Sequence, residues 1–466
     1  MYDRVLASDA SFNGRFFTGV LTTGIYCLPA CKARKPKREN VQFFPSCEAA
    51  RSAGLRPCKK CHPDDFARGA DPVLEGIEAL VTEVRARPAE FPDVRSIVRR
   101  SGFGSTRLFE LFRQHYHASP AEVLLRARLG RARERLLASE EGLLAVANDA
   151  GFESASVFHE QFRRLNGLTP AAYRALRTGR SFTVALGPEY PVGYLRRALG
   201  RDGASVTERL SGNAYRAAIR LSHGPTLLAL TLAADRVTAE IASGSAVEAH
   251  AIVVGLLGLD QDAAAFARLA RKLGLGRLVQ GRAGLRVSQT PSVFDGLLWS
   301  IIGQQINLGF ACTLKRRLVE RAGEPVGDGL FALPTPAAVA GLRVAELQPL
   351  QFSARKAEYL IHTAQRIAGG ELDLTALPRL SATRAERTLL AIRGLGPWSV
   401  NYLMMRSLGF ADCVPLGDTG VTSGLQALLK LEQRPDVDET QRRMRPFSPY
   451  RSLATAHLWQ YEKPIP

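Results

Sequence analysis

The chain has 466 residues, 46% of them hydrophobic, and carries 62 Lys and Arg against 44 Asp and Glu, a formal net charge of +18. This length allows three or four domains, and the basic excess indicates a polyanionic partner, nucleic acid rather than a membrane. Seven cysteines are too few for a disulfide scaffold of this size. Without a long apolar run or an apolar signal core at the N-terminus, we expect a cytoplasmic protein that associates with the nucleoid.

Residues 1–70 contain two close cysteine pairs separated by 26 residues. The pairs are Cys27 with Cys31, and Cys58 with Cys61. This spacing predicts one closed tetrahedral Zn²⁺ site with four thiolate ligands; the alternative is four unrelated buried thiols. Cys47 lies between the pairs and is expected to be a free thiol. His62 adjoins a ligand but is not needed, because four cysteines fill the shell.

The sequence around the pairs closely resembles the N-terminal zinc domain of the Ada adaptive-response proteins. The two matching stretches are TTGIYCLPACKARKPKREN and RPCKKCHPDD. The resemblance implies that Cys27 takes a methyl group from a methyl phosphotriester in DNA. Four thiolates on one Zn²⁺ leave the cluster anionic, so that a sulfur stays nucleophilic at neutral pH. The side chains placed to hold flanking phosphates are Thr22, Thr23, Lys32, Arg34 and Lys35. Leu28 stands where the family often has arginine, which predicts weaker local DNA affinity, and a purely structural zinc module remains an alternative.

Residues 71–178 read as all-helical, with two similar units at 94–116 and 143–167. Each has apolar residues at helical spacing around a short turn that contains Gly and Phe, which predicts a helix-turn-helix. The helix between the units, 125–137, carries five arginines. We interpret these arginines as a solvated linker face rather than as base readers.

The tract 151–174 resembles the AraC/XylS-type DNA-binding domain. In that family the second helix of each unit enters the major groove. The side chains that this places near double-stranded DNA are Ser105, Thr106 and Arg107 in the first unit, and Ser154, Ser156 and His159 in the second. The resemblance implies a transcriptional activator that would also meet RNA polymerase, but it does not specify an operator.

In residues 180–290 the hydrophobic pattern changes from a helical period to alternation. Alternating stretches at 182–186, 215–221, 226–232 and 237–241, separated by turn residues, predict a small antiparallel sheet. Two helices are expected to follow, from about Val247 and about Asp262. The block resembles the mixed α/β N-terminal domain of AlkA-type glycosylases, and we expect it to be a structural partner without a catalytic constellation.

Residues 392–418 carry the strongest motif. A predicted helix at 382–391 runs into the turn Gly394-Leu395-Gly396, and a second helix begins at Pro397. Glycines let the backbone approach an anion, and the free N–H groups of the new helix point at it. A loop then leads to Asp418. Taken singly, the turn would be only a turn, the aspartate a helix cap and the nearby aromatic side chains core residues.

Together, hairpin, spacing and aspartate resemble the helix-hairpin-helix signature of DNA base-excision glycosylases, and residues 180–460 resemble 3-methyladenine DNA glycosylase II. The resemblance implies that the hairpin turn holds alkylated DNA, and that the segment with Gln304 and Gln305 enters the gap left by a flipped nucleotide. Gln305 matches the wedge position, which is often leucine. The implied base pocket is Trp398, Tyr402 and Trp459, and the implied catalytic residue is Asp418.

A glycosylase must rotate the damaged nucleotide out of the stack. Aromatic faces can hold a cationic alkylated purine, and Asp418 can stabilise an oxocarbenium-like sugar and orient water. Enzymes that also cut the strand use a lysine, whereas no lysine lies between Lys356 and Lys430, and Trp398 stands at the corresponding position. This pattern predicts a monofunctional enzyme. The Pro-Cys-His-Arg motif of alkylguanine methyltransferases is absent from the chain.

We therefore predict a multi-domain, mainly α protein with α+β parts. The expected domains are 1–70 (zinc and methyl acceptor), 71–178 (DNA-binding), 180–290 (α/β) and 291–466 (glycosylase). The predicted function is an alkylation-damage response that combines base excision, methyl transfer and transcriptional regulation. The alternative is a regulator whose glycosylase half only grips DNA. The sequence does not specify the preferred lesion, the promoters or the oligomeric state.

Overall fold

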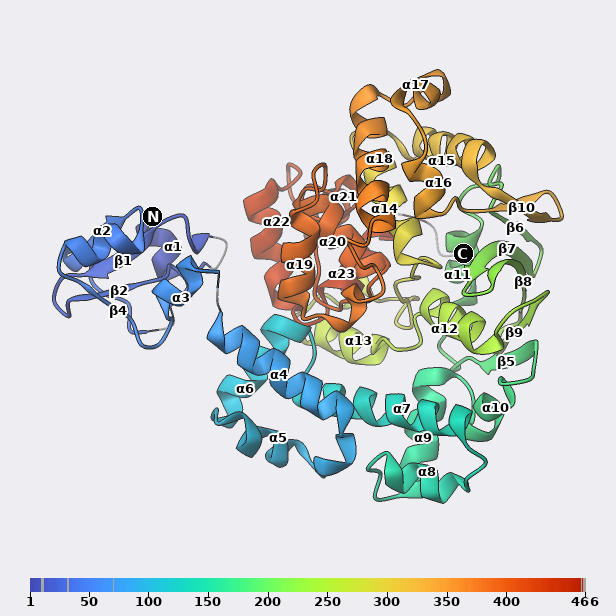
Figure 1. The fold of residues 1–466 in the computed structure, drawn as a ribbon, viewed down its shortest axis with the longest axis horizontal. Helices are drawn as coiled ribbons and strands as arrows, with labels where there is room; N and C mark the ends of the chain where they lie inside the picture. Colours follow the sequence, from blue (N-terminus) through green and yellow to red (C-terminus); the bar gives the residue numbers. More distant parts are fainter. Residues whose placement is uncertain (10–11, 32, 70, 462, 464–466) are drawn as a thin grey trace. The chain divides into compact units, whose positions relative to one another are not determined.

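The computed structural model describes residues 1–9, 12–31, 33–69, 71–461 and 463 (Figure 1). Lys32, one of the predicted phosphate contacts, lies outside these residues. The chain forms two compact units, Met1–Glu83 and Val84–Pro466, and the boundary falls within helix α4 (Pro72–Ala86). No helix in the described part of the chain is long and apolar enough to cross a membrane.

Unit one is built on a four-stranded sheet with strand order β3-β1-β2-β4. Its elements are α1 (Tyr2–Leu6), β1 (Phe17–Val20), β2 (Ile25–Cys27), β3 (Val41–Phe44), α2 (Cys47–Ser52), β4 (Arg56–Pro57) and α3 (Pro63–Ala67). The side chains of Leu55 and Phe44 pack closely over Gly19 of β1. A Cβ at Gly19 would lie 2.5 Å from Leu55 and 2.6 Å from Phe44, so only glycine fits there. The sequence did not predict this sheet, since its strands are too short to show a period of two.

Two helix-turn-helix units follow, as the sequence predicts. Their helices are α5 (Val94–Ser101), α6 (Ser105–Tyr116), α7 (Pro120–Ala138), α8 (Leu143–Asp149), α9 (Ala155–Asn166) and α10 (Pro170–Ala175). Gly102 (φ 68°) and Gly151 (φ 85°) turn the chain in each unit in the left-handed conformation that glycine favours.

The arginines of α7 are exposed (Arg126 and Arg133) or half-buried, as a solvated face requires, but they also bond within the protein, which the sequence did not predict. Arg128 donates to the carbonyls of Phe91 (2.9 Å) and Pro92 (2.8 Å). The other bonds run from Arg126 to the Asp260 carbonyl, from Arg131 to Asp149, from Arg133 to Asn166 and from Arg135 to Glu141. The arginines of α7 therefore hold this helix against the segment before α5 and against the second helix-turn-helix unit.

A five-stranded antiparallel sheet, of order β5-β9-β8-β7-β6, forms the α/β part. Its elements are β5 (Ser181–Ala185), α11 (Val192–Leu199), β6 (Glu208–Ser211), β7 (Ala214–Leu221), β8 (Gly224–Leu232), β9 (Arg236–Ile241), α12 (Ala246–Leu257) and α13 (Ala263–Lys272). The four predicted strands are confirmed. The sequence missed β6, a four-residue edge strand, and α11.

The second helix-turn-helix unit and this sheet share one hydrophobic core, formed by residues between Leu129 and Leu259. Gly167 approaches so closely that a Cβ there would lie 2.4 Å from the side chain of Val184. His250 Nε2 lies 2.8 Å from the Asn166 carbonyl, and its ring packs edge-on against Tyr173. The regulator-like and glycosylase-like parts are therefore packed together, not merely joined by a linker.

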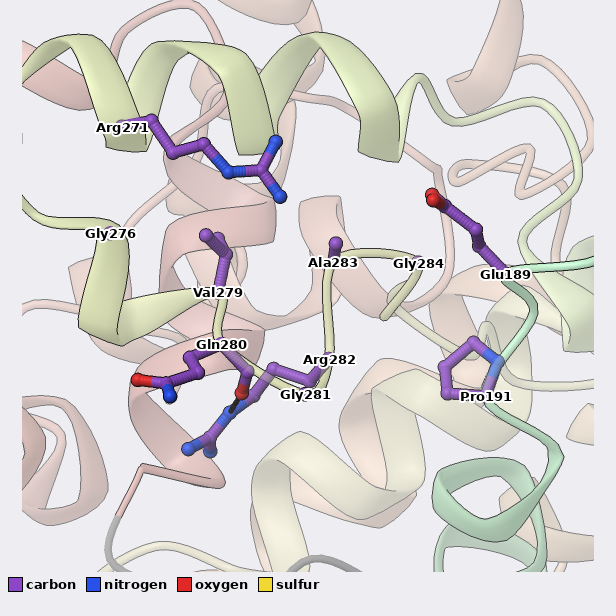
Figure 2. Close-up of a pocket in the computed structure, with 10 residues that line it drawn as sticks. All are labelled: Glu189, Pro191, Arg271, Gly276, Val279, Gln280, Gly281, Arg282, Ala283 and Gly284. Carbon is purple, nitrogen blue, oxygen red and sulfur yellow. Dashed lines mark hydrogen bonds between the residues drawn. The ribbon is translucent and has the colours of Figure 1, made fainter.

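A cavity of about 490 Å³ lies where the loop Gly276–Gly284 meets the segment before α11 (Figure 2). Arg271 and Glu189 lie on opposite sides of it. Gly284 has no room for a side chain, because a Cβ would lie 2.1 Å from the Glu189 carbonyl oxygen. Arg282 reaches from this loop to the Gln460 carbonyl (2.5 Å) and so supports the end of the last helix.

The remaining helices enclose the largest core. They are α14 (Val293–Ile302), α15 (Leu308–Ala322), α16 (Pro336–Ala340), α17 (Val344–Leu347), α18 (Ala354–Ala368), α19 (Ala382–Leu390), α20 (Pro397–Arg406), α21 (Thr419–Leu429), α22 (Val437–Met444) and α23 (Arg451–Trp459), with a hairpin of β10 (Glu324–Gly327) and β11 (Leu330–Ala332). The helices α19 and α20 fall where the sequence predicts them.

The first helix-turn-helix unit contacts this helical part through the end of α6. His115 Nδ1 lies 2.9 Å from Thr383 Oγ1 on α19. The Asp412 N–H donates to His117 Nδ1 (3.3 Å), and the His117 ring packs edge-on against Phe410. The helix that precedes the Gly-x-Gly turn is thus braced by a helix of the first helix-turn-helix unit.

Candidate active site and metal centre

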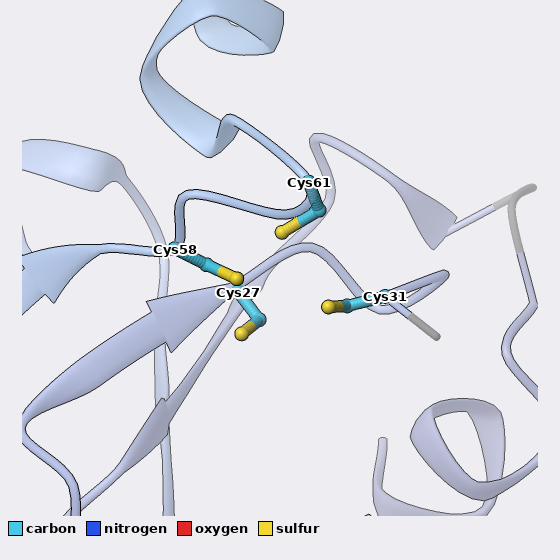
Figure 3. A group of neighbouring side chains, drawn as sticks. All are labelled: Cys27, Cys31, Cys58 and Cys61. Carbon is cyan, nitrogen blue, oxygen red and sulfur yellow. The ribbon is translucent and has the colours of Figure 1, made fainter. Parts of the chain in front are cut away.

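The four cysteines of unit one converge, as the sequence predicts (Figure 3). Cys27 ends β2, Cys31 lies in the loop after it, and Cys58 and Cys61 lie in the turn after β4. Their sulfur atoms all lie within 4.8 Å of one another. Tetrahedral Zn²⁺ with bonds of about 2.3 Å requires sulfurs about 3.8 Å apart. The donor set fits one Zn²⁺ with four thiolates, which it would hold deprotonated.

The four sulfurs differ in their hydrogen bonds. The N–H of Leu28 donates to Cys61 Sγ and that of Lys60 to Cys58 Sγ, both at 3.4 Å. A backbone hydrogen bond from Ala33 reaches Cys31. Among the described residues no backbone N–H reaches the sulfur of Cys27, which is also half-buried rather than buried. Among the described residues, Cys27 is therefore the thiol of the cluster that no backbone N–H engages.

The side chains around the cluster differ in their freedom to meet DNA. Thr22, Thr23 and Arg34 are exposed. Lys35 Nζ donates to the Cys31 carbonyl (2.8 Å), and burial lowers the pKa of Lys35. Leu28 is buried in the core of unit one and so does not contact DNA through its side chain.

The two other candidate ligands do not enter the cluster. Cys47 is a buried free thiol that donates to the Pro63 carbonyl (3.4 Å). His62 Nδ1 instead lies 3.4 Å from Asp65.

The predicted DNA-reading residues lie at the N-terminal ends of α6 and α9. Ser105 and Thr106 are exposed, as are Ser156 and His159. Ser154 caps α9 by accepting from the Val157 N–H (3.4 Å). Arg107 is paired with Glu110 (3.1 Å), so its guanidinium is partly engaged.

The Gly-x-Gly turn has the form that the sequence predicts. Gly394 has φ +96°, and a Cβ there would lie 2.4 Å from the ring of Tyr359. The side chain of Leu395 is buried in the core, so that a DNA contact at this position would come from its main chain. Gly396 caps α20. Arg393 and Arg355 both lie over the ring of Tyr359, which brings positive charge to the turn.

Asp418 lies in a cleft of about 1400 Å³ with the three predicted aromatic side chains. The indole N–H groups of Trp459 and Trp398 donate to Asp418 Oδ1 (2.8 Å) and Oδ2 (3.2 Å). Trp398 stacks on Tyr402 with centroids 5.5 Å apart, and Tyr402 lies 6.0 Å from Trp459. Asp418 also caps α21 by accepting from the Val421 N–H (3.0 Å), so the capping alternative holds as well.

Gln304 and Gln305 line the same cleft. Gln305 is exposed and has a left-handed backbone, φ 56°. The side chain of Gln304 turns to the Gly-x-Gly turn, where Nε2 donates to the Gly394 carbonyl (2.7 Å) and to Ser399 Oγ (3.0 Å). Leu308, half exposed at 50%, also lines the cleft.

Sequence reasoning missed several residues of the cleft. The guanidinium of Arg201 lies 4.8 Å from the ring centroid of Trp299, and Arg197 and Lys463 also line the cleft. Trp299 lies in α14, just before Gln304 and Gln305, but its neighbour Arg201 comes from a part of the chain without any motif. Proximity in the fold, not local pattern, places these cations near Asp418.

Sequence models of three protein families match the chain. They are "Metal binding domain of Ada" over residues 1–64, "Helix-turn-helix domain" over 97–176 and "HhH-GPD superfamily base excision DNA repair protein" over 298–449. The "Probable bifunctional transcriptional activator/DNA repair enzyme AlkA" of Mycobacterium tuberculosis is 30% identical over 482 residues, which cover 98% of this chain and 95% of that protein.

The chain belongs to this family of bifunctional transcriptional activator/DNA repair enzymes. The DNA-3-methyladenine glycosylase of Bacillus subtilis is 34% identical over 206 residues, 43% of this chain and 68% of that protein. The Archaeoglobus fulgidus 3-methyladenine DNA-glycosylase structure superposes with a TM-score of 0.54 over 60% of this chain and 98% of that one, at 21% identity, and shows the shared fold.

The family membership confirms the predicted multi-domain class. Like its family, the chain has a zinc-binding domain, a helix-turn-helix regulator and a DNA glycosylase, and its partner is DNA. The domain boundaries drawn from the sequence at residues 70, 178 and 290 remain predictions.

Proposed function

We propose that the C-terminal half excises alkylated purines as a monofunctional DNA glycosylase, with Asp418 as its catalytic carboxylate. The observation that carries this proposal is the fixed position of Asp418. Both carboxylate oxygens accept indole N–H groups, and a helix N-terminus adds a third donor. Such donors orient a carboxylate, so that it can face a developing positive charge.

The steps follow from the residues around the cleft. The Gly394–Gly396 turn and the first N–H groups of α20 hold a phosphate beside the lesion. Gln305 enters the stack as the damaged nucleotide leaves it. The flipped base lies against the stacked pair of Trp398 and Tyr402, whose electron-rich faces favour a cationic alkylated purine. Asp418 then stabilises the oxocarbenium-like sugar and orients the attacking water.

The absence of strand cleavage rests on the position of the lysines. Trp398 occupies the site after the turn where a Schiff-base lysine would stand, but Lys463 lines the described part of the cleft. Burial lowers the pKa of Lys463, which favours the neutral amine. The enzyme is monofunctional in this proposal, because Lys463 lies outside the turn and α20. Reduction with borohydride distinguishes a monofunctional glycosylase from one that also cleaves the strand through an imine.

For unit one we propose a single methyl transfer. The sulfur of Cys27 attacks the methyl carbon of a methyl phosphotriester, an S–C bond forms, the C–O bond breaks, and the phosphodiester leaves with the electron pair. No backbone N–H of the described residues donates to the Cys27 sulfur, whereas the other three sulfurs each accept one, which supports Cys27 as the acceptor. The transfer removes one negative charge from the cluster, which should raise affinity for DNA and activate transcription together with RNA polymerase.

The decisive experiment measures base release from methylated DNA by the wild type and by Asp418→Asn. Wild-type excision and at least about 10²-fold slower release by the variant are expected, comparable to the loss of one key electrostatic group. DNA binding should be retained. If the wild type binds DNA but releases no base, the glycosylase half only grips DNA, as in the alternative function.

A further inference from the structure

The loop between α14 and α15, residues 303–307, is fixed by side chains on both sides. Lys356 Nζ donates to the carbonyl of Ile302 (2.7 Å), the last residue of α14. Asn307 accepts from the Phe310 N–H (2.9 Å) and so caps α15. The centre of the loop is fixed by Gln304. We name residues 303–307 the wedge loop.

Gln304 connects the wedge loop to the Gly-x-Gly turn through a closed network. Its Nε2 group uses both N–H donors, one on the Gly394 carbonyl (2.7 Å) and one on Ser399 Oγ (3.0 Å). Ser399 in turn donates to the Ser300 carbonyl of α14 (3.3 Å). Ser399 and Ser300 are both buried, so these bonds are shielded from water. The amide of Gln304 therefore faces the protein and is not free to read DNA.

The next residue carries the strain that this network sustains. Gln305 has φ 56°, a left-handed conformation that a glutamine does not favour when unconstrained. Its side chain is nevertheless exposed and lines the cleft. The backbone of the loop thus already presents the side chain of Gln305 at the cleft.

We propose that Gln304 is a positioning residue which locks the wedge loop to the phosphate-binding turn, so that Gln305 is presented to DNA in a preformed conformation. This inference rests on the proposed function, which assigns the wedge to Gln305. The turn at residues 394–396 and the wedge loop then move as one rigid body. Phosphate binding by the turn and insertion of Gln305 into the gap therefore occur together. A preformed loop does not lose conformational freedom when it inserts.

The main test replaces Gln304 with Met, which keeps length and volume but removes both donors. The expected result is that nucleotide extrusion, followed by 2-aminopurine fluorescence beside the lesion, becomes about 10- to 30-fold less favourable, the loss of two neutral hydrogen bonds. The Kd for undamaged DNA should change by less than about 3-fold, because the turn itself is intact. Gln365→Met is the control, because Gln365 on α18 is an exposed glutamine with one long hydrogen bond, to the Ala340 carbonyl (3.5 Å).

A second pair of variants separates positioning from simple destabilisation. Ser399→Ala removes one acceptor and should give a smaller loss, and its effect should not add to that of Gln304→Met because both break one network. In a Gln305→Asn background the same Gln304→Met change should cost less, since asparagine adopts the left-handed conformation more readily. A general loss of stability would affect both backgrounds equally.

The outcomes are distinct. Extrusion by Gln304→Met equal to that by Gln365→Met, or an equal penalty in both backgrounds, overturns the proposal. If Gln304→Met does not fold, Ser399→Ala and its combination with Gln305→Asn decide in the same way. A wild type that extrudes the nucleotide but releases no base contradicts the proposed function alone, because fluorescence reports extrusion and not bond cleavage.

Discussion

The indole N–H of Trp459 donates to Oδ1 of Asp418 at 2.8 Å, and that of Trp398 to Oδ2 at 3.2 Å. Two aromatic side chains of the proposed base pocket therefore also orient the carboxylate. Gly420 makes this possible, since a Cβ there would lie 2.7 Å from the Trp459 ring. The site couples base recognition to the position of the negative charge.

Trp459→Phe should separate these two roles. The substitution keeps an aromatic face but removes the N–H to Asp418. We expect base release to fall about 10-fold, the effect of losing a hydrogen bond to a charged group, with DNA affinity retained. Single-turnover release of 7-methylguanine measures it. Trp299→Phe is the control, because Trp299 has no bond to Asp418, and an equal loss there would assign the effect to packing alone.

Borohydride should trap no covalent adduct between the wild-type protein and damaged DNA. The reason is that Trp398, not lysine, follows the turn. Denaturing gel electrophoresis of the reduced reaction gives the readout. Should an adduct form, Lys463→Ala identifies its source: disappearance of the adduct would make Lys463 an imine-forming residue and the enzyme a lyase.

The purified protein should contain one zinc per chain, and Cys58→Ala should lose it. Small zinc domains fold with their metal, so unit one should unfold in this variant. Metal analysis and limited proteolysis provide the two measurements. Cys47→Ala should keep its zinc, because this thiol donates to the Pro63 carbonyl outside the cluster. Full metal content in Cys58→Ala would contradict the four-cysteine site.

Reaction with methyl phosphotriester DNA should add one methyl group, found by mass spectrometry on Cys27. The methylated protein should bind DNA more tightly, because the cluster has lost one negative charge, and the gain should shrink as salt rises. Titrations at low and high salt measure it. A methyl group on Cys31 would refute the argument from N–H···S bonds, and a salt-independent gain would refute the electrostatic one.

Unit two should lose stability as the pH falls below about 6.5. Burial lowers the pKa of His250 to about 4 and that of His457 to about 3. Unfolded histidines titrate near 6.5, so only the unfolded chain gains these protons between about pH 6.5 and 4. The expected cost is about 2 kcal/mol for each histidine at pH 5.

Tryptophan fluorescence reports this unfolding selectively, because Trp299, Trp398 and Trp459 are all in unit two. His250→Gln keeps a donor for the Asn166 carbonyl but does not titrate, and should flatten the pH dependence. The exposed His159, replaced by Gln, is the control and should leave the slope unchanged. A pH-independent wild type would contradict neutral burial of these histidines.

Sequence reasoning was strongest where chemistry is local. The cysteine pairs, the Gly-x-Gly turn and the helix-turn-helix turns depend on residues close together in the chain, and the structure has all of them. It missed the partners of the α7 arginines, which come from distant segments, and it missed β6, a strand that is too short. Arg201 beside Trp299 and Gln304 on Gly394 are likewise pairs that no local pattern contains.

The core shared by the second helix-turn-helix unit and the five-stranded sheet fixes the ratio of regulator to glycosylase at one to one. The regulator and the repair enzyme lie on one chain, and Gly167, Tyr173 and Asn166 pack against Val184 and His250, so the two parts form one compact unit. A cell with separate proteins can make many enzyme copies for each copy of the regulator. In this protein, every molecule that is bound at a promoter is one glycosylase fewer to search the rest of the chromosome. Transcriptional regulation and base excision therefore compete for the same molecules.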